Sequence, residues 1–433
     1  MDMKKRLLAC GLVLAMTVSA LSGCGKDNGS SSSSGQSSSS APAAIDLSTV
    51  KDPYLTTSGL AGDAVVAKVG EVEVTAAELL YWINYGIELS LAQYGGKMVE
   101  LPWDADLGGM TMADQMKQSA LNAAAFYALI PTIAQQEGLS VNQETMDELN
   151  RQREQAIATL GSEEVAEHSF WHQMITWDLL SELSQRGDLH LQLQELYFGE
   201  GSENYPTDAE VLAYAQDELG VYRAKHILIS TRDENDQPLD DAAIAEKKAK
   251  ADDLIAQIRA ADDPIAMFDT LMHEHSEDPG LITAPEGYTT QKGQMVPQFE
   301  DTALSLKDGE ISDPVESQFG YHIILRLPIS PDNYRSQLVA QLMQTKTDQW
   351  LEEYGVQTTE NYDKIDVAQF NNKVRSMQLS IQNEINAVLQ AQQEGSGAGS
   401  SDSSSAPASS QPDGSGAASA DSASAPASSQ PEG

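Results

Sequence analysis

The chain has 433 residues, with 26 Lys and Arg against 65 Asp and Glu, which gives a formal net charge of −39 at pH 7. Nucleic-acid binding needs clustered basic side chains that displace counterions from phosphates, so this charge excludes DNA and RNA as partners. At roughly 100 to 200 residues per domain the length allows two or three domains, and 41% hydrophobic residues suffice for their cores. The two cysteines, Cys10 and Cys24, both lie near the start and exclude a disulfide framework or a Cys-rich zinc site in the folded part.

The N-terminus has the pattern of an export signal. Basic residues at 4–6 precede an apolar run, 7–21, that is too short for a comfortable membrane span. Leu-Ser-Gly then precedes Cys24, which resembles a bacterial lipobox, where cleavage before the cysteine leaves a thiol that carries a lipid anchor. An ordinary signal peptide with an incidental cysteine is the alternative. We expect residues 1–23 to be a lipoprotein signal peptide and Cys24 to be lipidated, at the extracytoplasmic face of the cell membrane.

Low-complexity segments flank the part that we expect to fold. Residues 24–62 and 394–433 are rich in Ser, Gly and Ala, a composition that cannot bury enough apolar surface to offset chain entropy. The second segment contains two copies of Ser-Ala-Pro-Ala-Ser-Ser-Gln-Pro, which is typical of a solvated spacer. We therefore predict a tether at 24–62 and a disordered tail at 394–433.

Helical periodicity dominates residues 63–220 and returns in 331–393. A short hairpin is predicted at 64–74, and capping boxes at Thr75 and Thr207 mark two helix starts. Each segment is short and has an apolar face to bury, so we expect both to pack into one helical lobe around an inserted domain. Further helices are predicted at 111–137, 143–160, 163–185, 331–350 and 367–390.

Residues 221–330 have a different pattern. An apolar strand at 222–229 contains His226, and a second strand at 322–326 begins with His322. Strand, helices and strand within this length predict a small α+β domain. The predicted fold class is therefore multidomain: a mainly α-helical lobe made of N- and C-terminal segments, an inserted α+β domain, and disordered tails. The helices of the inserted domain are predicted at 242–260, 265–275 and 299–306.

Five short motifs follow one another in this segment. They are Lys225-His-Ile-Leu228, Ser276-Glu-Asp-Pro-Gly280, Gly293-Gln-Met-Val-Pro-Gln-Phe-Glu300, Leu306-Lys-Asp-Gly-Glu-Ile-Ser-Asp-Pro-Val315 and Gly320-Tyr-His-Ile-Ile324. In order and spacing they resemble the signatures of parvulin-type peptidyl-prolyl cis-trans isomerases. With the lipobox and the helical flanks, the whole chain is similar to the extracytoplasmic lipoprotein foldases that carry such a domain.

The chemistry implied by this resemblance needs an apolar shelf and a few oriented polar groups. Rotation about an X-Pro bond breaks no bond, and an enzyme accelerates it by binding the twisted amide better than either planar isomer. Met295 and Phe299, four residues apart, would share one helix face. The resemblance implies that these two form the proline pocket. It also implies that His226 and His322 organise the hydrogen bonds of the site and that Asp278 faces the amide.

Structural alternatives remain open for these residues. The histidines, like Met295 and Phe299, could be ordinary core residues, and Asp278 could be a turn residue before a proline. The segment 281–292 departs from the family pattern, with Thr290 where an aromatic residue is common. This departure favours an alternative function, a chaperone or holdase whose parvulin domain is catalytically inactive. An acidic, solute-binding surface lipoprotein is a third hypothesis that no motif supports.

The sequence analysis therefore predicts a lipid-anchored foldase that isomerises prolyl bonds and holds exported proteins. Its expected partners are unfolded or newly exported polypeptides with X-Pro bonds, and the membrane through the lipid anchor. A homodimer is left open, and no cofactor or metal is expected. In the stretch after the first strand, Arg232 stands among three acidic residues, so we predict no preference for phosphorylated substrates.

Overall fold

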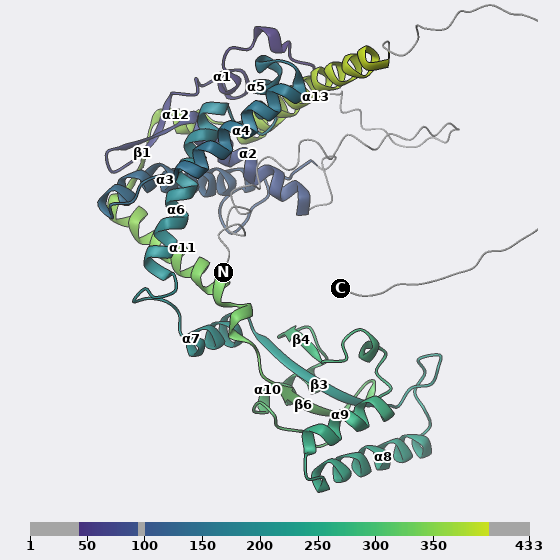
Figure 1. Cartoon of the computed structure of the whole chain (residues 1–433). Helices are drawn as coiled ribbons and strands as arrows, with labels where there is room; N and C mark the ends of the chain where they lie inside the picture. The colour runs from purple at the N-terminus through teal and green to yellow at the C-terminus, as the bar shows by residue number, and fades with distance from the viewer. Residues whose placement is uncertain (1–42, 94–99, 398–433) are drawn as a thin grey trace, which may run out of the picture.

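The computed structural model describes residues 43–93 and 100–397. Figure 1 shows a large helical lobe and, below it, a smaller domain built around a sheet. The predicted signal peptide (1–23), Cys24 and most of the predicted C-terminal tail lie outside the described residues. Among the described helices, none combines the length and the apolar character that crossing a bilayer requires.

Segments from both ends of the chain build the helical lobe. Its sheet has the order β2-β1-β7, and β1 pairs antiparallel with β2 on one side and with β7 on the other. One hydrophobic core contains buried residues from Leu47 to Phe198 and from Val339 to Ile381. The predicted fold class, a helical lobe interrupted by an inserted domain, is thus confirmed. The elements are α1 (Pro53–Ser58), β1 (Val65–Val69), β2 (Val72–Thr75), α2 (Ala76–Gln93), α3 (Met112–Gln136), α4 (Gln143–Leu160), α5 (Glu163–Trp171), α6 (Trp177–Phe198), α11 (Arg335–Tyr354), β7 (Val356–Thr358), α12 (Glu360–Asp363) and α13 (Val367–Gly397).

Both predicted capping boxes are present. The Thr75 hydroxyl accepts the N–H of Glu78 (3.3 Å), and the Glu78 carboxylate accepts the N–H of Thr75 (2.7 Å). Thr207 and Glu210 make the same reciprocal pair at the start of α7 (Asp208–Ala213). Each box satisfies two donors that a helix start leaves without an intrahelical partner.

The predicted tether, 24–62, is wrong in its second half. Residues 47–49 form a short 3-10 helix, η4 (Leu47–Thr49), and α1 follows it. Leu47 and Tyr54 are buried in the core of the lobe, and the Tyr54 hydroxyl accepts the N–H of Thr176 (3.2 Å). These apolar side chains are sparse in the sequence, yet burying them against the lobe offsets the cost of ordering the segment.

Two helix boundaries also differ from the prediction. The helix expected at 163–185 is divided into α5 and α6, because Met174 has a left-handed backbone (φ 55°) and the Thr176 side chain caps a new start. The last helix, α13, continues to Gly397, past the expected beginning of the tail at 394.

The inserted domain is a four-stranded antiparallel sheet with the order β4-β3-β6-β5. Helices α8 and α9 pack on one face and α10 on the other, in two separate hydrophobic clusters. The elements are β3 (Val221–Ser230), α8 (Asp241–Ala260), α9 (Pro264–His275), β4 (Tyr288–Gln291), α10 (Pro297–Ser305), β5 (Val315–Ser317) and β6 (Gly320–Leu327).

Strand alternation assigns the side chains of β3 and β6 to the two faces. Ile227 and Ile323 face α8 and α9, whereas Ala224 and Ile324 face α10. Because successive side chains of a strand point to opposite faces, the even-numbered residues of both strands share the α10 face. This places both predicted histidines on that face.

Candidate active site

The two histidines meet across the central pair of strands. The register pairs His226 with Ile324 and Leu228 with His322, so the histidines are diagonal neighbours on one face. Their Nδ1 atoms are 3.3 Å apart and their ring centroids 5.1 Å. The predicted pairing of two histidines from two strands is present.

Asp278 lies on the far side of His226. It caps the short 3-10 helix η6 (Pro279–Ile282), where its Oδ1 accepts the N–H of Gly280 (3.1 Å). Its other oxygen, Oδ2, is 2.8 Å from Nε2 of His226. Asp278 is therefore a turn residue whose turn contact also orients its carboxylate toward His226. That it faces the amide of a substrate stays a prediction.

Two further side chains extend this line of contacts, and the sequence analysis missed both. The Tyr288 hydroxyl donates to Oδ2 of Asp278 (2.6 Å), and the Ser317 hydroxyl lies 2.7 Å from Nε2 of His322. The result is one continuous hydrogen-bonded chain of five side chains, which we call the polar chain. It consists of Ser317, His322, His226, Asp278 and Tyr288.

Burial and hydrogen bonding set the charges of the polar chain. Burial alone would raise the pKa of Asp278, but the hydrogen bonds from His226 and Tyr288 outweigh it and lower the pKa to about 2. Burial, helped by the nearby His226, lowers the pKa of His322 to about 4. At neutral pH Asp278 is therefore a carboxylate and His322 is a neutral imidazole.

The ionised carboxylate determines the direction of its hydrogen bond with His226. The Asp278 carboxylate can only accept, so Nε2 of His226 carries a proton. In the arrangement of ring protons that we infer for the other contacts, Nδ1–H of His322 donates to Nδ1 of His226. Nε2 of His322 then accepts the hydroxyl proton of Ser317. Every member of the polar chain then has a partner of the right kind, and Asp278 carries its negative charge.

An apolar surface adjoins the polar chain. Phe299 on α10 is only 2% exposed, and its ring stands edge-on to the rings of His226 (5.2 Å) and His322 (5.7 Å). Half-buried Met295 packs on the same cluster, which also contains Tyr222 and Ile324. Phe299 is thus brought to the histidines, and Met295 packs on the cluster that contains Phe299.

The predicted reason for that pairing is wrong. Met295 is not on the helix, because α10 begins at Pro297 and the preceding residue, Val296, is extended. The ring of Pro297 suits the first helical position and also disfavours a helical conformation in the residue before it. The loop that ends at Val296, and not a shared helix face, brings Met295 to Phe299.

Thr290, where the family pattern commonly has an aromatic residue, is buried opposite Tyr222 on the sheet. Its hydroxyl donates to the side chain of Gln294 (3.0 Å). Tyr288, two residues earlier on the same strand, reaches Asp278 instead. The alternation of β4 was the signal that could have indicated Tyr288, because residues 288 and 290 share a face.

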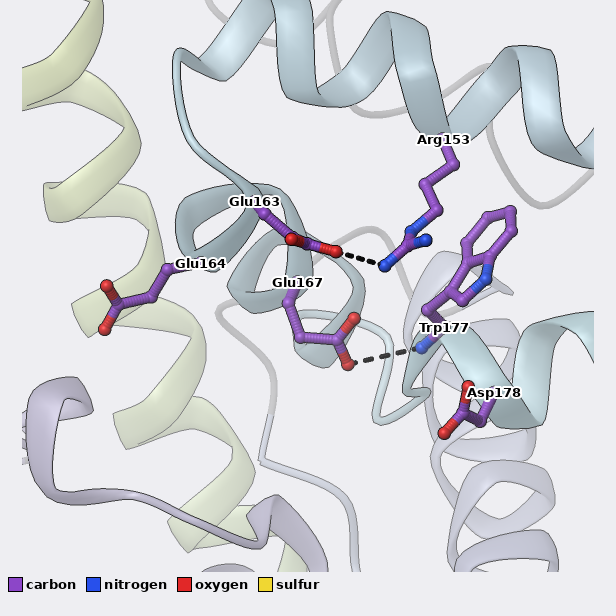
Figure 2. Close-up of a pocket in the computed structure, with 6 residues that line it drawn as sticks. All are labelled: Arg153, Glu163, Glu164, Glu167, Trp177 and Asp178. Carbon is purple, nitrogen blue, oxygen red and sulfur yellow. Dashed lines mark hydrogen bonds and ion pairs between the residues drawn. The ribbon is translucent and has the colours of Figure 1, made fainter.

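A separate cavity of about 570 Å³ lies in the helical lobe, between α4, α5 and α6 (Figure 2). The Arg153 guanidinium packs over the Trp177 ring (5.3 Å) and pairs with Glu163, while the N–H of Trp177 donates to Glu167 (3.2 Å). None of the predicted site residues lines it. Within residues 43–93 and 100–397, no three His, Cys, Asp or Glu side chains are grouped as a metal site.

A comparison with protein-family models finds a match within the inserted domain. Residues 226–327 match the family model described as the PPIC-type PPIASE domain, or Rotamase. The chain is 27% identical over 227 residues to "Foldase protein PrsA" of Caldanaerobacter subterraneus, covering 51% of this chain and 60% of that relative. It is 36% identical over 137 residues to "Chaperone SurA" of Chromohalobacter salexigens, covering 30% of this chain and 29% of that relative.

One solved structure, "Crystal Structure of PrsA from Bacillus subtilis", aligns with 67% of this chain and 92% of its own at 20% identity. The TM-score is 0.21, which supports no conclusion about the arrangement of the whole molecule. The chain spans less than two thirds of the length of each of the two curated relatives above. The residues matched by the family model, 226–327, include the polar chain and the apolar surface beside it.

Proposed function

We propose that this chain, whose residues 226–327 form a PPIC-type domain, is a parvulin-type peptidyl-prolyl cis-trans isomerase that also holds unfolded proteins. The observation that carries the proposal is the polar chain lying against the buried ring of Phe299. A prolyl isomerase needs this combination: an apolar surface for the proline ring and fixed polar groups beside the amide.

The geometry suits a reaction that makes and breaks no covalent bond. Amide resonance gives rotation a barrier of about 18–20 kcal/mol, and a bound amide that is twisted loses that resonance. We infer that Met295 and Phe299 hold the proline ring while Asp278 and the histidines face the amide. Because the pKa values keep Asp278 ionised and His322 neutral at pH 7, the site keeps a fixed charge pattern while the bond rotates.

The helical lobe would supply the holding function. The names of the relatives, foldase and chaperone, support this assignment. The lobe also presents exposed large apolar side chains, including Tyr85 and Leu89 on α2 (each 52% exposed). Their spacing of four residues puts both on one helix face, which suits contact with apolar segments of an unfolded polypeptide.

We further propose that a lipid on Cys24 anchors the chain at the extracytoplasmic face of the membrane. The support comes from the sequence: the basic start, the short apolar run and the small residues before the cysteine. Cys24→Ser is expected to move the protein from the membrane fraction to the soluble fraction. A membrane-bound Cys24→Ser protein would contradict lipid anchoring.

Phosphorylated substrates are expected to gain no advantage. Arg232 is already engaged: its Nε donates to the carbonyl of Gln318 (2.7 Å), its Nη1 donates to the carbonyl of Asp236 (2.8 Å), and its guanidinium lies over the Phe319 ring (5.8 Å). Three of the next four residues are acidic and would repel a phosphoryl group. Isomerisation of a phosphoSer-Pro peptide should be no faster than that of its unphosphorylated twin in paired exchange spectra. Faster turnover of the phosphopeptide by ten-fold would contradict this.

The alternative is a holdase whose PPIC-type domain binds peptides without turnover, which the departure at Thr290 favours. The complete polar chain favours catalysis. The two hypotheses are separated by measuring the isomerisation of an Ala-Pro peptide in the presence of the full chain.

A further inference from the structure

Tyr288 is the last member of the polar chain and contacts both Asp278 and His226. It begins β4 and pairs with Ala224 of β3, so its side chain lies on the same face as His226. Its hydroxyl donates to Oδ2 of Asp278 (2.6 Å), and its ring stands edge-on to His226 with 5.8 Å between centroids. Burial and the Asp278 charge raise the pKa of Tyr288, so the hydroxyl keeps its proton.

Gly280 leaves the space that the Tyr288 hydroxyl fills, and a second glycine, Gly287, directly precedes the tyrosine. A Cβ on Gly280 would lie 1.9 Å from the Tyr288 hydroxyl oxygen, so only glycine fits there with the tyrosine in place. Gly287 has a left-handed backbone (φ 92°), and a Cβ there would come within 2.8 Å of the Ala224 carbonyl oxygen. Gly280 therefore makes room for the Tyr288 hydroxyl, and Gly287 lets the chain approach β3 directly before the tyrosine.

The contacts of the carboxylate show what the hydroxyl adds. Oδ1 of Asp278 accepts one N–H, from Gly280, whereas Oδ2 accepts both His226 and Tyr288. Without the hydroxyl, Oδ2 would keep only the histidine, and the carboxylate could rotate or exchange its oxygens. Rotation would free His226 to change its tautomer, and the donor direction of the whole polar chain depends on that tautomer.

We propose that Tyr288 is a positioning residue for prolyl isomerisation: its hydroxyl fixes the Asp278 carboxylate, and through it the tautomers of His226 and His322. The proposal rests on the isomerase function proposed above. Tyr288 acts through Asp278, so its loss should lower kcat more than it raises KM. The phenyl ring alone should preserve the packing on His226.

The test compares Tyr288→Phe with a matched control, Tyr321→Phe, in the full chain. Tyr321 lies on the opposite face of the sheet, in the cluster with α8 and α9. For an Ala-Pro peptide, Tyr288→Phe is expected to lower kcat/KM about ten-fold, which is the size expected for the loss of one hydrogen bond to a charged group. KM should change less than about two-fold. Tyr321→Phe should leave both unchanged.

A second readout does not depend on turnover. Long-range ¹H–¹⁵N spectra of the histidine rings should show His226 protonated at Nε2 and His322 at Nδ1 in the parent chain. In Tyr288→Phe these signals are expected to lose their single-tautomer pattern. Gly280→Ala, which pushes the hydroxyl away from Asp278, should give the same change.

The outcomes distinguish a failure of the positioning role of Tyr288 from a failure of the proposed isomerase function. Single-tautomer spectra in both Tyr288→Phe and Gly280→Ala, or an unchanged kcat/KM in an active Tyr288→Phe chain, would overturn the positioning role. A parent chain without isomerase activity would refute the proposed function, and the ring spectra would still decide whether Tyr288 fixes the histidines.

Discussion

Asp278→Leu is expected to lower kcat/KM for an Ala-Pro peptide roughly a hundred-fold. The substitution removes the negative charge of the polar chain and leaves Nε2–H of His226 and the Tyr288 hydroxyl without their acceptor. The loss should exceed that of Tyr288→Phe, because two donors and the fixed charge are affected together. The measurement is isomerisation by the full chain at pH 7, by exchange spectroscopy.

A matched control separates loss of the site from loss of the fold. Asp252 is an exposed carboxylate on α8, on the opposite side of the sheet from the polar chain. Asp252→Leu should keep full activity, and amide hydrogen exchange of β3 and β6 should show that both variants stay folded. A folded Asp278→Leu chain with more than about a third of the parent activity would show that Asp278 has no part in the reaction.

The stability of the inserted domain is expected to fall as pH is lowered from 6.5 to 4, by up to about 3 kcal/mol. The folded pKa of His322 is about 4, below the ordinary value of 6.5. Between these values the unfolded chain binds the proton first, so acidification favours unfolding. The stabilising effect of Asp278, whose folded pKa is about 2, is lost only at lower pH, between about 3.8 and 2.

His322→Asn is expected to remove most of this pH dependence. The amide nitrogen of Asn can donate to Nδ1 of His226 as the imidazole does, but it does not titrate. All five tryptophans lie outside 221–330, so the domain is best followed by hydrogen exchange of β3 and β6 peptides, corrected for the intrinsic rate at each pH. His273→Asn on α9 is the control, since its side chain is exposed. If the stability of the parent chain and of His322→Asn depended equally on pH, the assignment of this pH dependence to His322 would be contradicted.

Local patterns were sufficient to predict much of the fold. The Thr-x-x-Glu boxes at Thr75 and Thr207 place reciprocal hydrogen bonds within four residues. These helix starts therefore depend little on tertiary contacts. The two strands with His226 and His322 were predictable because a strand that packs on both sides carries an apolar run. The insertion was predictable because the two helical segments are each short and each has an apolar face to bury, so they were expected to pack against each other around the domain between them.

Features that depend on tertiary contacts were not predictable in this way. The segment from 46 to 60 has a polar composition, yet Leu47 and Tyr54 order it by packing on the lobe. The alternation within β4 indicates that Tyr288 and Thr290 share a face, but only the pairing of β3 with β4 shows that this face adjoins Asp278. Met295 was assigned correctly to the apolar surface, but for a helical reason that Pro297 rules out.

The most direct test of the account is whether the full chain accelerates cis-trans exchange of an Ala-Pro peptide at pH 7. We expect the parent chain to accelerate exchange and Asp278→Leu to lose that effect while β3 and β6 remain protected. A folded parent chain that leaves the exchange rate of every X-Pro peptide tested unchanged would contradict the isomerase assignment. The holdase alternative would then be favoured.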